Sequence, residues 1–345
     1  MGKNDIKIDF VLSWVDGNDL SWIDRKNEAL KQLRPNQKTV DDENDECRYR
    51  DMGLLRYWFR GVEKFAPWVN KIYLVTCGQK PEWLNDNNPK LVLINHEDYI
   101  PKEYLPTFNS NTIETNLHRI ETLSEHFVSF NDDVFLLKSI SPEFFFKKGE
   151  PVLPCNLNIC RFYGNNNWSR ICINDYCIVN DHFNIKKSIW DNREKWFSIK
   201  RLGLKMAFMN FVRYKINKTF SIYGYDHIAN PHLKSTYQEV WDAFPNILDA
   251  SSRSRFRSDI QVNHWLMIAW NIAKGRFYPV KSGKRGKMIH VSSNTISSIL
   301  DTIKQPSMAQ LCINDSFRND NPYYLFHEIA KTFDSILPEK SSFEI

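Results

Sequence analysis

Four short segments built almost wholly from apolar residues recur in the first part of the chain, and helix-like patterns separate them. The apolar segments are residues 6–15, 71–78, 90–100 and 127–130. The helical patterns cover residues 20–34, about 51–65, and 111–125. A strand that is apolar throughout is buried on both faces, so this alternation predicts an α/β fold whose sheet is mostly parallel and covered by helices.

The later sequence predicts a smaller helical lobe on this core. Residues 151–180 are interpreted as short strands, and residues 185–222 as a basic, aromatic helical insertion. Further helices are expected at 233–244, 259–274 and about 319–335. We therefore expect one domain over 1–345, with a core formed by 1–180 and 225–345.

Polar residues follow three of the apolar segments at the point where each strand should end. They occupy 16–19, 76–79 and 131–133. Because ligands bind beyond the carboxyl ends of the strands in parallel α/β sheets, these three segments are expected to meet at one site.

The most unusual of these segments is Asn131-Asp132-Asp133, which follows a buried strand. Two adjacent carboxylates in an apolar setting are costly unless a cation compensates them. Carboxylate oxygens are preferred ligands of Mg²⁺ and Mn²⁺, so Asp132 and Asp133 are candidate metal ligands at a diphosphate. The alternative is an Asp pair in a turn or helix cap.

Residues 14–19 (WVDGND) are a candidate nucleotide-binding segment. Trp14 offers an aromatic edge and Gly17 allows close approach of a ligand. Asp16 and Asp19 would complete the segment. A plain strand-to-helix turn with an Asp cap explains the same residues equally well.

Arginines form two candidate phosphate-binding groups. Arg48 and Arg50 stand with Asp51 at the start of a predicted helix that also carries Arg56 and Arg60, although charges spaced by four residues also suit a solvated helix face. Arg255 and Arg257 belong to the sequence SSRSRFRSD, which is either a phosphate-binding fork or an exposed basic turn.

Three further residues are candidates for contact with a sugar or a reacting hydroxyl group. Glu114 and His118 are four residues apart on a predicted helix, where they could meet a sugar or pair with each other. His227 lies in DHIANPHLKST, where it could serve as a general base or be a solvated loop residue.

Composition limits the possible partners. The net charge of +5 suits anionic substrates and anionic lipid, and it does not indicate a dedicated nucleic-acid-binding protein. The sequence has no run of eighteen apolar residues and no signal-peptide pattern at its start. Seven cysteines, an odd number, favour reduced thiols in the cytoplasm. Two C-x4-C pairs are wider than usual zinc pairs and favour ordinary thiols over a zinc site: Cys155, Cys160, Cys172 and Cys177.

With these motifs in order, the chain resembles the Stealth family of sugar-phosphate transferases. The resemblance rests on IDFVLSWVDGND (8–19), on the long block from RYRDMGLLRYWF to FVSFNDDVFL (48–136), on DHIANPHLKSTYQEVWDAFP with RFRSD (226–245 and 255–259), and on CIND (312–315). Members include bacterial enzymes of capsule and surface-polysaccharide synthesis and the animal lysosomal-enzyme N-acetylglucosamine-1-phosphotransferase.

The resemblance implies a glycosyltransferase-like Rossmann core and a UDP-sugar donor. It implies transfer of a sugar-1-phosphate to a hydroxyl group of a growing glycan, with release of UMP. The family's Asp of the Asn-Asp-Asp motif matches Asp132 or Asp133, and its His of the third block matches His227. Its Arg matches Arg257, with Arg255 retained because the spacing to Asp259 departs by one residue. The last block supplies Asn314 and Asp315.

Together these inferences give a hypothesis for the mechanism. Asp132, Asp133 and Asp315 would hold Mg²⁺ or Mn²⁺, Arg257 and Arg48 would bind phosphate oxygens, and His227 would take the acceptor proton. The acceptor would be a lipid-linked oligosaccharide or polysaccharide, and residues 185–222 would lie on the anionic inner face of the membrane or simply pack on the core. The alternatives are an ordinary metal-dependent glycosyltransferase, which releases UDP, and a non-enzymatic glycan-binding surface protein.

Overall fold

A five-stranded sheet forms the centre of the computed structural model, which describes residues 6–33, 46–157, 167–216, 227–258, 261–281, 283–315, 317 and 322–345. The strand order is β3-β2-β1-β4-β8, with β8 antiparallel to β4 and the other neighbours parallel. The strands are β1 (Ile8–Ser13), β2 (Ile72–Thr76), β3 (Leu91–Asn95), β4 (His126–Asn131) and β8 (Asn230–Leu233).

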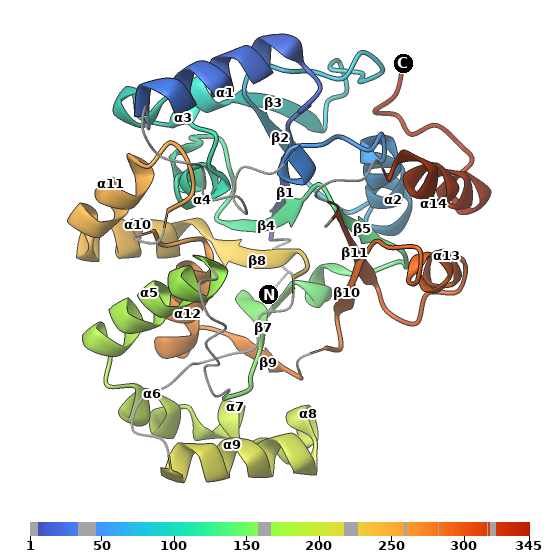
Figure 1. Ribbon diagram of the computed structural model, residues 1–345. Coiled ribbons are helices and arrows are strands. Elements are labelled where there is room, and N and C mark those ends of the chain that lie inside the picture. The colour runs from blue at the N-terminus through green and yellow to red at the C-terminus, as the bar shows by residue number, and fades with distance from the viewer. Residues whose placement is uncertain are drawn as a thin grey trace.

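Helices cover this sheet on both faces, as Figure 1 shows. Successive side chains of a strand point to opposite faces, and β1 illustrates the consequence. Phe10 and Leu12 belong to one buried cluster, whereas Val11 between them belongs to another. The helices around the sheet are α1 (Leu20–Leu33), α2 (Leu55–Phe65), α3 (His96–Tyr99), α4 (Ser110–Thr115), α10 (Lys234–Ala243), α11 (Pro245–Ser252) and α12 (Trp265–Ala273).

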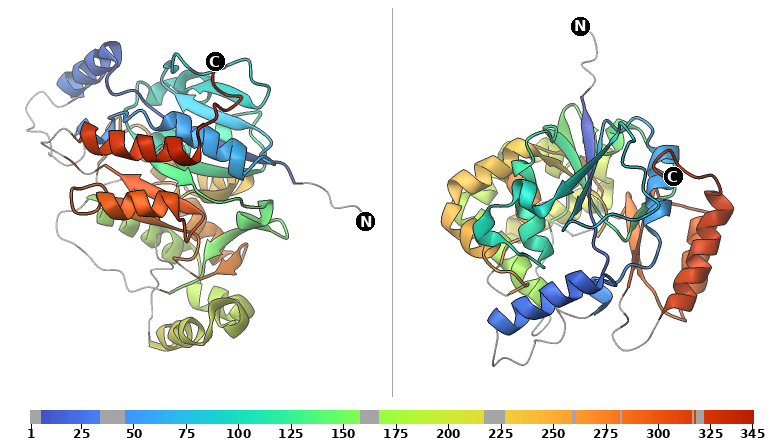
Figure 2. Two further views of the ribbon diagram at one scale, coloured as in Figure 1. Left: turned by 90° about the vertical axis from the view of Figure 1, so that its right-hand side faces the viewer. Right: turned by 90° about the horizontal axis from the view of Figure 1, so that it is seen from above.

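Two three-stranded sheets extend the core. One has the order β10-β11-β5, and the other has the order β6-β7-β9. Their strands are β5 (Val134–Leu136), β6 (Phe146–Lys147), β7 (Glu150–Pro154), β9 (Tyr278–Val280), β10 (Gly286–His290) and β11 (Gln310–Asn314). Helices α13 (Ile296–Lys304) and α14 (Tyr323–Ile336) lie beside the first of these sheets (Figure 2), and Phe333 of α14 packs on Phe135 of β5. The turn of Asp132 and Asp133 therefore lies between the central sheet and this second sheet.

A helical lobe lies at one end of the molecule, at the bottom of Figure 1. It comprises α6 (Ile185–Asp191), α7 (Arg193–Trp196), α8 (Ile199–Leu202) and α9 (Leu204–Ile216), and α5 (Asn167–His182) connects it to the core. Short 3₁₀ helices occur at Glu46–Arg48, Lys102–Tyr104, Leu117–Arg119 and Pro142–Phe144. The predicted α/β class, with its mostly parallel sheet and smaller helical lobe, is confirmed.

Three local predictions were wrong. The described residues of 151–180 contain one strand, β7, and Asn167–His182 is a helix whose buried residues recur at helical spacing. The helix expected at 111–125 ends at Thr115, where the Asn116 side chain bonds back to the Thr112 carbonyl oxygen at 2.8 Å. The strand expected at 90–100 ends at Asn95, which begins a helix through a capping box with Asp98.

The four cysteines of the C-x4-C pairs do not share one environment. Cys155 is buried and its thiol donates to the Lys195 carbonyl oxygen at 3.5 Å. Cys172 is buried and Cys177 is exposed on the same helix, and Cys160 lies outside the described residues.

Candidate active site

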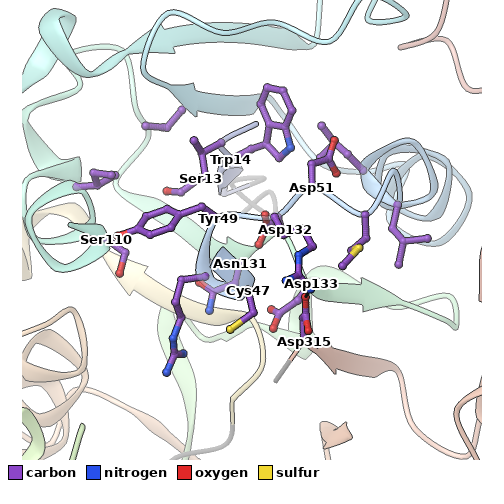
Figure 3. A pocket seen from close by; sticks show the side chains of 18 of the residues that line it. Ser13, Trp14, Cys47, Tyr49, Asp51, Ser110, Asn131, Asp132, Asp133 and Asp315 are labelled. Carbon is purple, nitrogen blue, oxygen red and sulfur yellow. Dashed lines mark hydrogen bonds and ion pairs between the residues drawn. The ribbon is translucent and has the colours of Figure 1, made fainter. Parts of the chain in front are cut away.

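A cavity of about 250 Å³ opens where the carboxyl ends of the strands meet (Figure 3). Residues that directly follow or end β1, β2, β4 and β11 contribute to its lining, and they include Trp14, Cys77, Asn131 and Asn314. The convergence expected from the sequence is therefore found for three strands of the central sheet, and β11 of the second sheet joins them.

Asp132 lies at the floor of this cavity with two other carboxylates nearby. Burial, followed by the negative charges of Asp133 and Asp51, raises the pKa of Asp132 to about 8. The pKa of Asp51 is also raised, mainly by burial. Without a bound cation, Asp132 is therefore largely protonated at neutral pH.

Asp133 has more partners but keeps one oxygen without any. Its Oδ2 accepts from the Cys312 thiol at 3.1 Å and from Asn314 Nδ2 at 3.3 Å, and it lies 3.8 Å from His227 Nε2. Its Oδ1 is buried without a hydrogen-bond partner in the part of the chain that the structure describes. Since a buried carboxylate oxygen is costly when unpaired, this atom is suited to a cation from outside the chain.

The residues present could hold a divalent cation at the Asp133 carboxylate, and ligand atoms of His227 and Cys312 lie within 4.8 Å of that carboxylate and of each other. Because Mg²⁺ and Mn²⁺ prefer oxygen ligands, His227 and Cys312 are left for other roles. The adjacent Asp132 carboxyl group adds a second candidate oxygen ligand. Asp315, the third predicted ligand, differs from Asp132 and Asp133. Its Oδ2 forms an ion pair with Arg50 Nη1 at 3.1 Å, so its negative charge is already compensated.

Arginines face these carboxylates across the cavity. Arg48 and Arg257 both line it, and Arg257 Nη2 donates to Ser110 Oγ at 2.6 Å. Arg255 is not among the lining residues, and its carbonyl oxygen accepts from the backbone N–H of Phe108. Of the two alternatives left open by the sequence, Arg257 is the one that faces the cavity.

The comparison with known proteins gives the family. Residues 7–34 match conserved region 1 of the Stealth proteins, and residues 48–152 match conserved region 2. The chain is 42% identical over 346 residues to the capsular polysaccharide phosphotransferase WcwK of Streptococcus pneumoniae, covering 98% of each chain. It is 40% identical over 342 residues to the receptor polysaccharide phosphotransferase WefC of Streptococcus gordonii, covering 98% of this chain and 99% of that one.

The chain belongs to the Stealth family. It is a phosphotransferase, like the streptococcal relatives that it matches from end to end. Among solved structures, the galactosyltransferase LgtC in complex with donor and acceptor sugar analogs is similar with a TM-score of 0.36 and 8% identity over 95% of each chain. That likeness is too weak to bear on function.

In this Stealth enzyme, the segment 14–19 has two parts: one lines the cavity, and the other forms the turn and helix cap beside it. Trp14 lines the cavity, and its Nε1 is a buried donor without a partner in the described residues. Asp19 instead caps α1, accepting from the backbone and hydroxyl of Ser21, and hydrogen bonds from Gln79 and Ser21 lower its pKa to about 2. The backbone N–H and carbonyl oxygen of Asp16 both bond to the Gln79 amide.

Gly17 has a structural role that the sequence did not reveal. A Cβ atom at Gly17 would stand 2.1 Å from the carbonyl oxygen of Tyr49. Glycine therefore lets the segment that carries Arg48 and Arg50 approach the end of β1. The contacts of Asp16, Gly17 and Asp19 are those of the turn-and-cap alternative.

Glu114 and His118 do not share a helix face, because α4 ends between them. Glu114 lines the cavity and its Oε2 lies 2.5 Å from His264 Nδ1. His118 is buried behind it, where its ring stacks on Tyr237 and burial lowers its pKa to about 3. The predicted pairing of Glu114 with His118 was wrong, and His118 is not among the residues that line the cavity.

Cys312 and Ser110 were not predicted from the sequence, whereas Arg50 was considered together with Arg48 as a candidate phosphate ligand. Cys312 had a readable signal, since it lies two residues before Asn314 on a strand and so points to the same face. Arg50 and Ser110 are placed by contacts with Asp315 and Arg257, which are distant in sequence.

Proposed function

We propose that this Stealth enzyme transfers a sugar-1-phosphate from a UDP-sugar to a hydroxyl group of a growing surface or capsular polysaccharide. The acceptor oxygen bonds to the β-phosphorus, the bond between that phosphorus and the bridging oxygen breaks, and UMP leaves. The product is a phosphodiester. The names of the streptococcal relatives, capsular and receptor polysaccharide phosphotransferases, support this reaction class.

The observation that carries the proposal is the combination of charges in one cavity. Asp132 and Asp133 lie on its floor, while Arg48 and Arg257 reach the same space. A carboxylate pair alone would repel a diphosphate, so the arrangement suits a diphosphate only together with a cation. Mg²⁺ or Mn²⁺ bound at these carboxylates would neutralise charge on the two phosphate groups.

The remaining residues receive distinct tasks. Arg257, fixed by Ser110, binds oxygens of the transferred phosphate, and Arg48 assists. His227 takes the proton of the acceptor hydroxyl group, and its ring is positioned by Asn131, whose Nδ2 lies 3.2 Å from His227 Nε2. Trp14 Nε1 offers a donor to the uridine.

The donor and the acceptor also suggest where the enzyme works. Nucleotide sugars are cytoplasmic metabolites, so we place the reaction in the cytoplasm with a lipid-linked oligosaccharide or polysaccharide as acceptor. The enzyme would then act peripherally at the inner face of the membrane.

The test is product analysis with a panel of UDP-sugars, an acceptor glycan and Mg²⁺ or Mn²⁺. UMP is the expected nucleotide product, and Asp132→Asn should release none. An ordinary glycosyltransferase would release UDP through the same metal and nucleotide. A glycan-binding protein without catalytic activity would release neither.

A further inference from the structure

Helix α9 in the lobe turns most of its large apolar side chains away from the core. The side chains that it fully buries are Ala207 and Asn210, one small and one polar, and it packs Met206 and Tyr214, partly buried, against the core. Its outward side carries large apolar side chains that are 42–70% exposed, namely Leu204, Phe208, Phe211 and Ile216. A surface helix normally shows the opposite arrangement, with its apolar stripe towards the core.

Hydrogen bonds explain how a helix with so little apolar burial is held. Asn210 Nδ2 donates to the carbonyl oxygens of Cys155 and Trp196 at 3.0 and 2.9 Å, and its Oδ1 accepts from the backbone of Leu157 at 3.0 Å. Of the outward apolar side chains, Phe211 also packs edge-on against the Phe197 ring, with 5.7 Å between the ring centroids. Leu204, Phe208 and Ile216 are 62–70% exposed and remain available for another contact.

The outward residues form one continuous surface, which we call the α9 face: Leu204, Lys205, Phe208, Phe211, Lys215 and Ile216. At 100° per residue these six positions cover one side of the helix, and all six are exposed. Lys205 and Lys215 lie among the apolar side chains, and Lys215 Nζ stands 5.5 Å from the Phe211 ring centroid.

The lobe that presents this face is strongly basic. Residues 185–216 contain nine Lys or Arg against Asp191 and Glu194, so their net charge of +7 exceeds the +5 of the entire chain. Asp191 is moreover paired with Lys187 at 2.5 Å. The exposed basic side chains around the α9 face include Lys200 and Arg201 of the neighbouring helix α8.

We propose that the α9 face docks on an anionic lipid bilayer, with α9 lying along the membrane surface. Apolar side chains enter the headgroup boundary while interspersed lysines bind anionic headgroups, which is how interfacial helices attach. Charge complementarity favours this occupant, since phosphate binding alone would not use Phe208 or Leu204. No helix of the described residues is long and apolar enough to cross a bilayer, so attachment would be at the surface.

The position of α9 is compatible with catalysis. In Figure 1 the helix runs along the outer edge of the lobe, away from the end of the molecule that holds α1 and α3. None of the residues of the α9 face lines the catalytic cavity. Docking would leave the cavity open and bring the enzyme to the surface where a lipid-linked acceptor resides.

The experiment is flotation of the full chain with vesicles, without donor or metal. Wild type should float with phosphatidylglycerol–phosphatidylcholine vesicles at low salt, and binding should fall about tenfold or more at high salt or on phosphatidylcholine alone. Two double variants should each reduce binding at low salt by a similar factor. One is Leu204→Ser with Phe208→Ser, and the other is Lys205→Glu with Lys215→Glu. The matched controls are Ile247→Ser and the pair Lys31→Glu with Lys304→Glu, which alter exposed residues elsewhere and should bind like wild type.

Three results would overturn the proposal. The first is wild type that stays unbound at low salt, and the second is α9 variants that float as well as wild type. The third is a dimer in sedimentation that Leu204→Ser with Phe208→Ser converts to a monomer, which would show that a second copy covers the face. Circular dichroism confirms folding of each variant. Flotation needs no turnover, so the two proposals can fail separately. An enzyme that floats but releases no UMP refutes the proposed reaction alone. An enzyme that releases UMP but does not float refutes docking alone.

Discussion

Apolar side chains are usually buried and charged side chains are usually exposed. The catalytic cavity and the α9 face depart from this arrangement in opposite directions. In the cavity, carboxylates lie among buried strands, and Asp133 keeps an oxygen without a partner in the described residues. On the α9 face, Leu204 and Phe208 lie in solvent at 70% and 62% exposure. Each arrangement is unfavourable for the chain alone, and each becomes favourable with a partner from outside: a cation with a diphosphate in one case, lipid in the other.

The two regions differ in how they are fixed. The turn of Asp132 and Asp133 is fixed by strands on both sides, and the Asp133 carbonyl oxygen accepts from Ile313 N–H at 2.8 Å. The lobe is held by buried apolar side chains such as Ile189 and Trp196, and by Lys195 Nζ, which binds Glu150 and two carbonyl oxygens at 2.8 Å. Substitutions in the cavity should therefore change chemistry and leave the fold intact, whereas substitutions on the α9 face should change attachment alone.

The largest effect is expected for Asp132→Asn and Asp133→Asn, which should abolish turnover. Thermal stability without metal should hold or rise, because each change replaces a buried carboxyl group, whose charged form its acidic neighbour disfavours, by a neutral amide. Asp86→Asn, at an exposed Asp paired with Lys80, is the matched control and should remain active. If both cavity variants keep their activity with EDTA present, the cavity needs no cation. The contrast between the cavity and the α9 face, each of which needs a partner from outside, then fails.

His227→Ala should lower kcat by about 10² to 10⁴, the usual contribution of a general base. His232→Ala should be milder for catalysis and should act on thermal stability, because His232 is fully buried and its ring stacks on Phe127. Steady-state kinetics and thermal unfolding of both variants separate the two roles. A reversed ranking in kcat would move the base to His232.

Arg257→Lys should lower kcat/KM by about 10²-fold, since lysine lacks the planar fork that binds two phosphate oxygens. Arg255→Lys should have a much smaller effect, because Arg255 does not line the cavity. Equal losses of kcat/KM in the two variants would show that lining the cavity does not distinguish the role of Arg257 from that of Arg255.

Cys312→Ala should weaken the apparent affinity for Mg²⁺ or Mn²⁺ by about 10-fold, because Asp133 loses a hydrogen-bond donor that orients it. Cys312→Ser keeps a donor at the same position and should restore most of that loss. Titration calorimetry with each metal measures both. Identical affinities in all three proteins would remove Cys312 from the site.

The last effect is a dependence on pH. Burial raises the pKa of Asp132 from 3.8 to about 8, so its contribution to stability is fully present below pH 3.8 and is lost as pH rises through 8. Metal binding below pH 8 must displace this proton, so metal affinity should rise with pH, by at most about tenfold per unit. Asp132→Asn should show neither this loss of metal-free stability nor the proton release.

The sequence predicted the centre of the fold and the convergence of strand ends at the cavity, because both depend on local patterns. Apolar strands and the polar residues at their ends are visible within a few positions, as at Asn131 to Asp133. The helix Asn167–His182 was missed although its buried residues follow helical spacing, because polar residues interrupt the apolar stripe.

What the sequence could not give depends on contacts between distant segments. Arg50 meets Asp315 across 265 positions, and Cys312 meets Asp133 across 179. Arg255 and Arg257 are chemically identical, so only the folded chain distinguishes the one that faces the cavity. The capping role of Asp19 competes with ligand binding at the same residue, and its contacts with Ser21 favour the cap.

The most direct measurement follows the β-phosphorus of the donor. The enzyme is given a UDP-sugar labelled with ³²P at that atom, an acceptor glycan and Mg²⁺ or Mn²⁺. We expect the label to enter the glycan in a phosphodiester and unlabelled UMP to accumulate. Label that stays on released UDP, while the glycan gains the sugar alone, would contradict it.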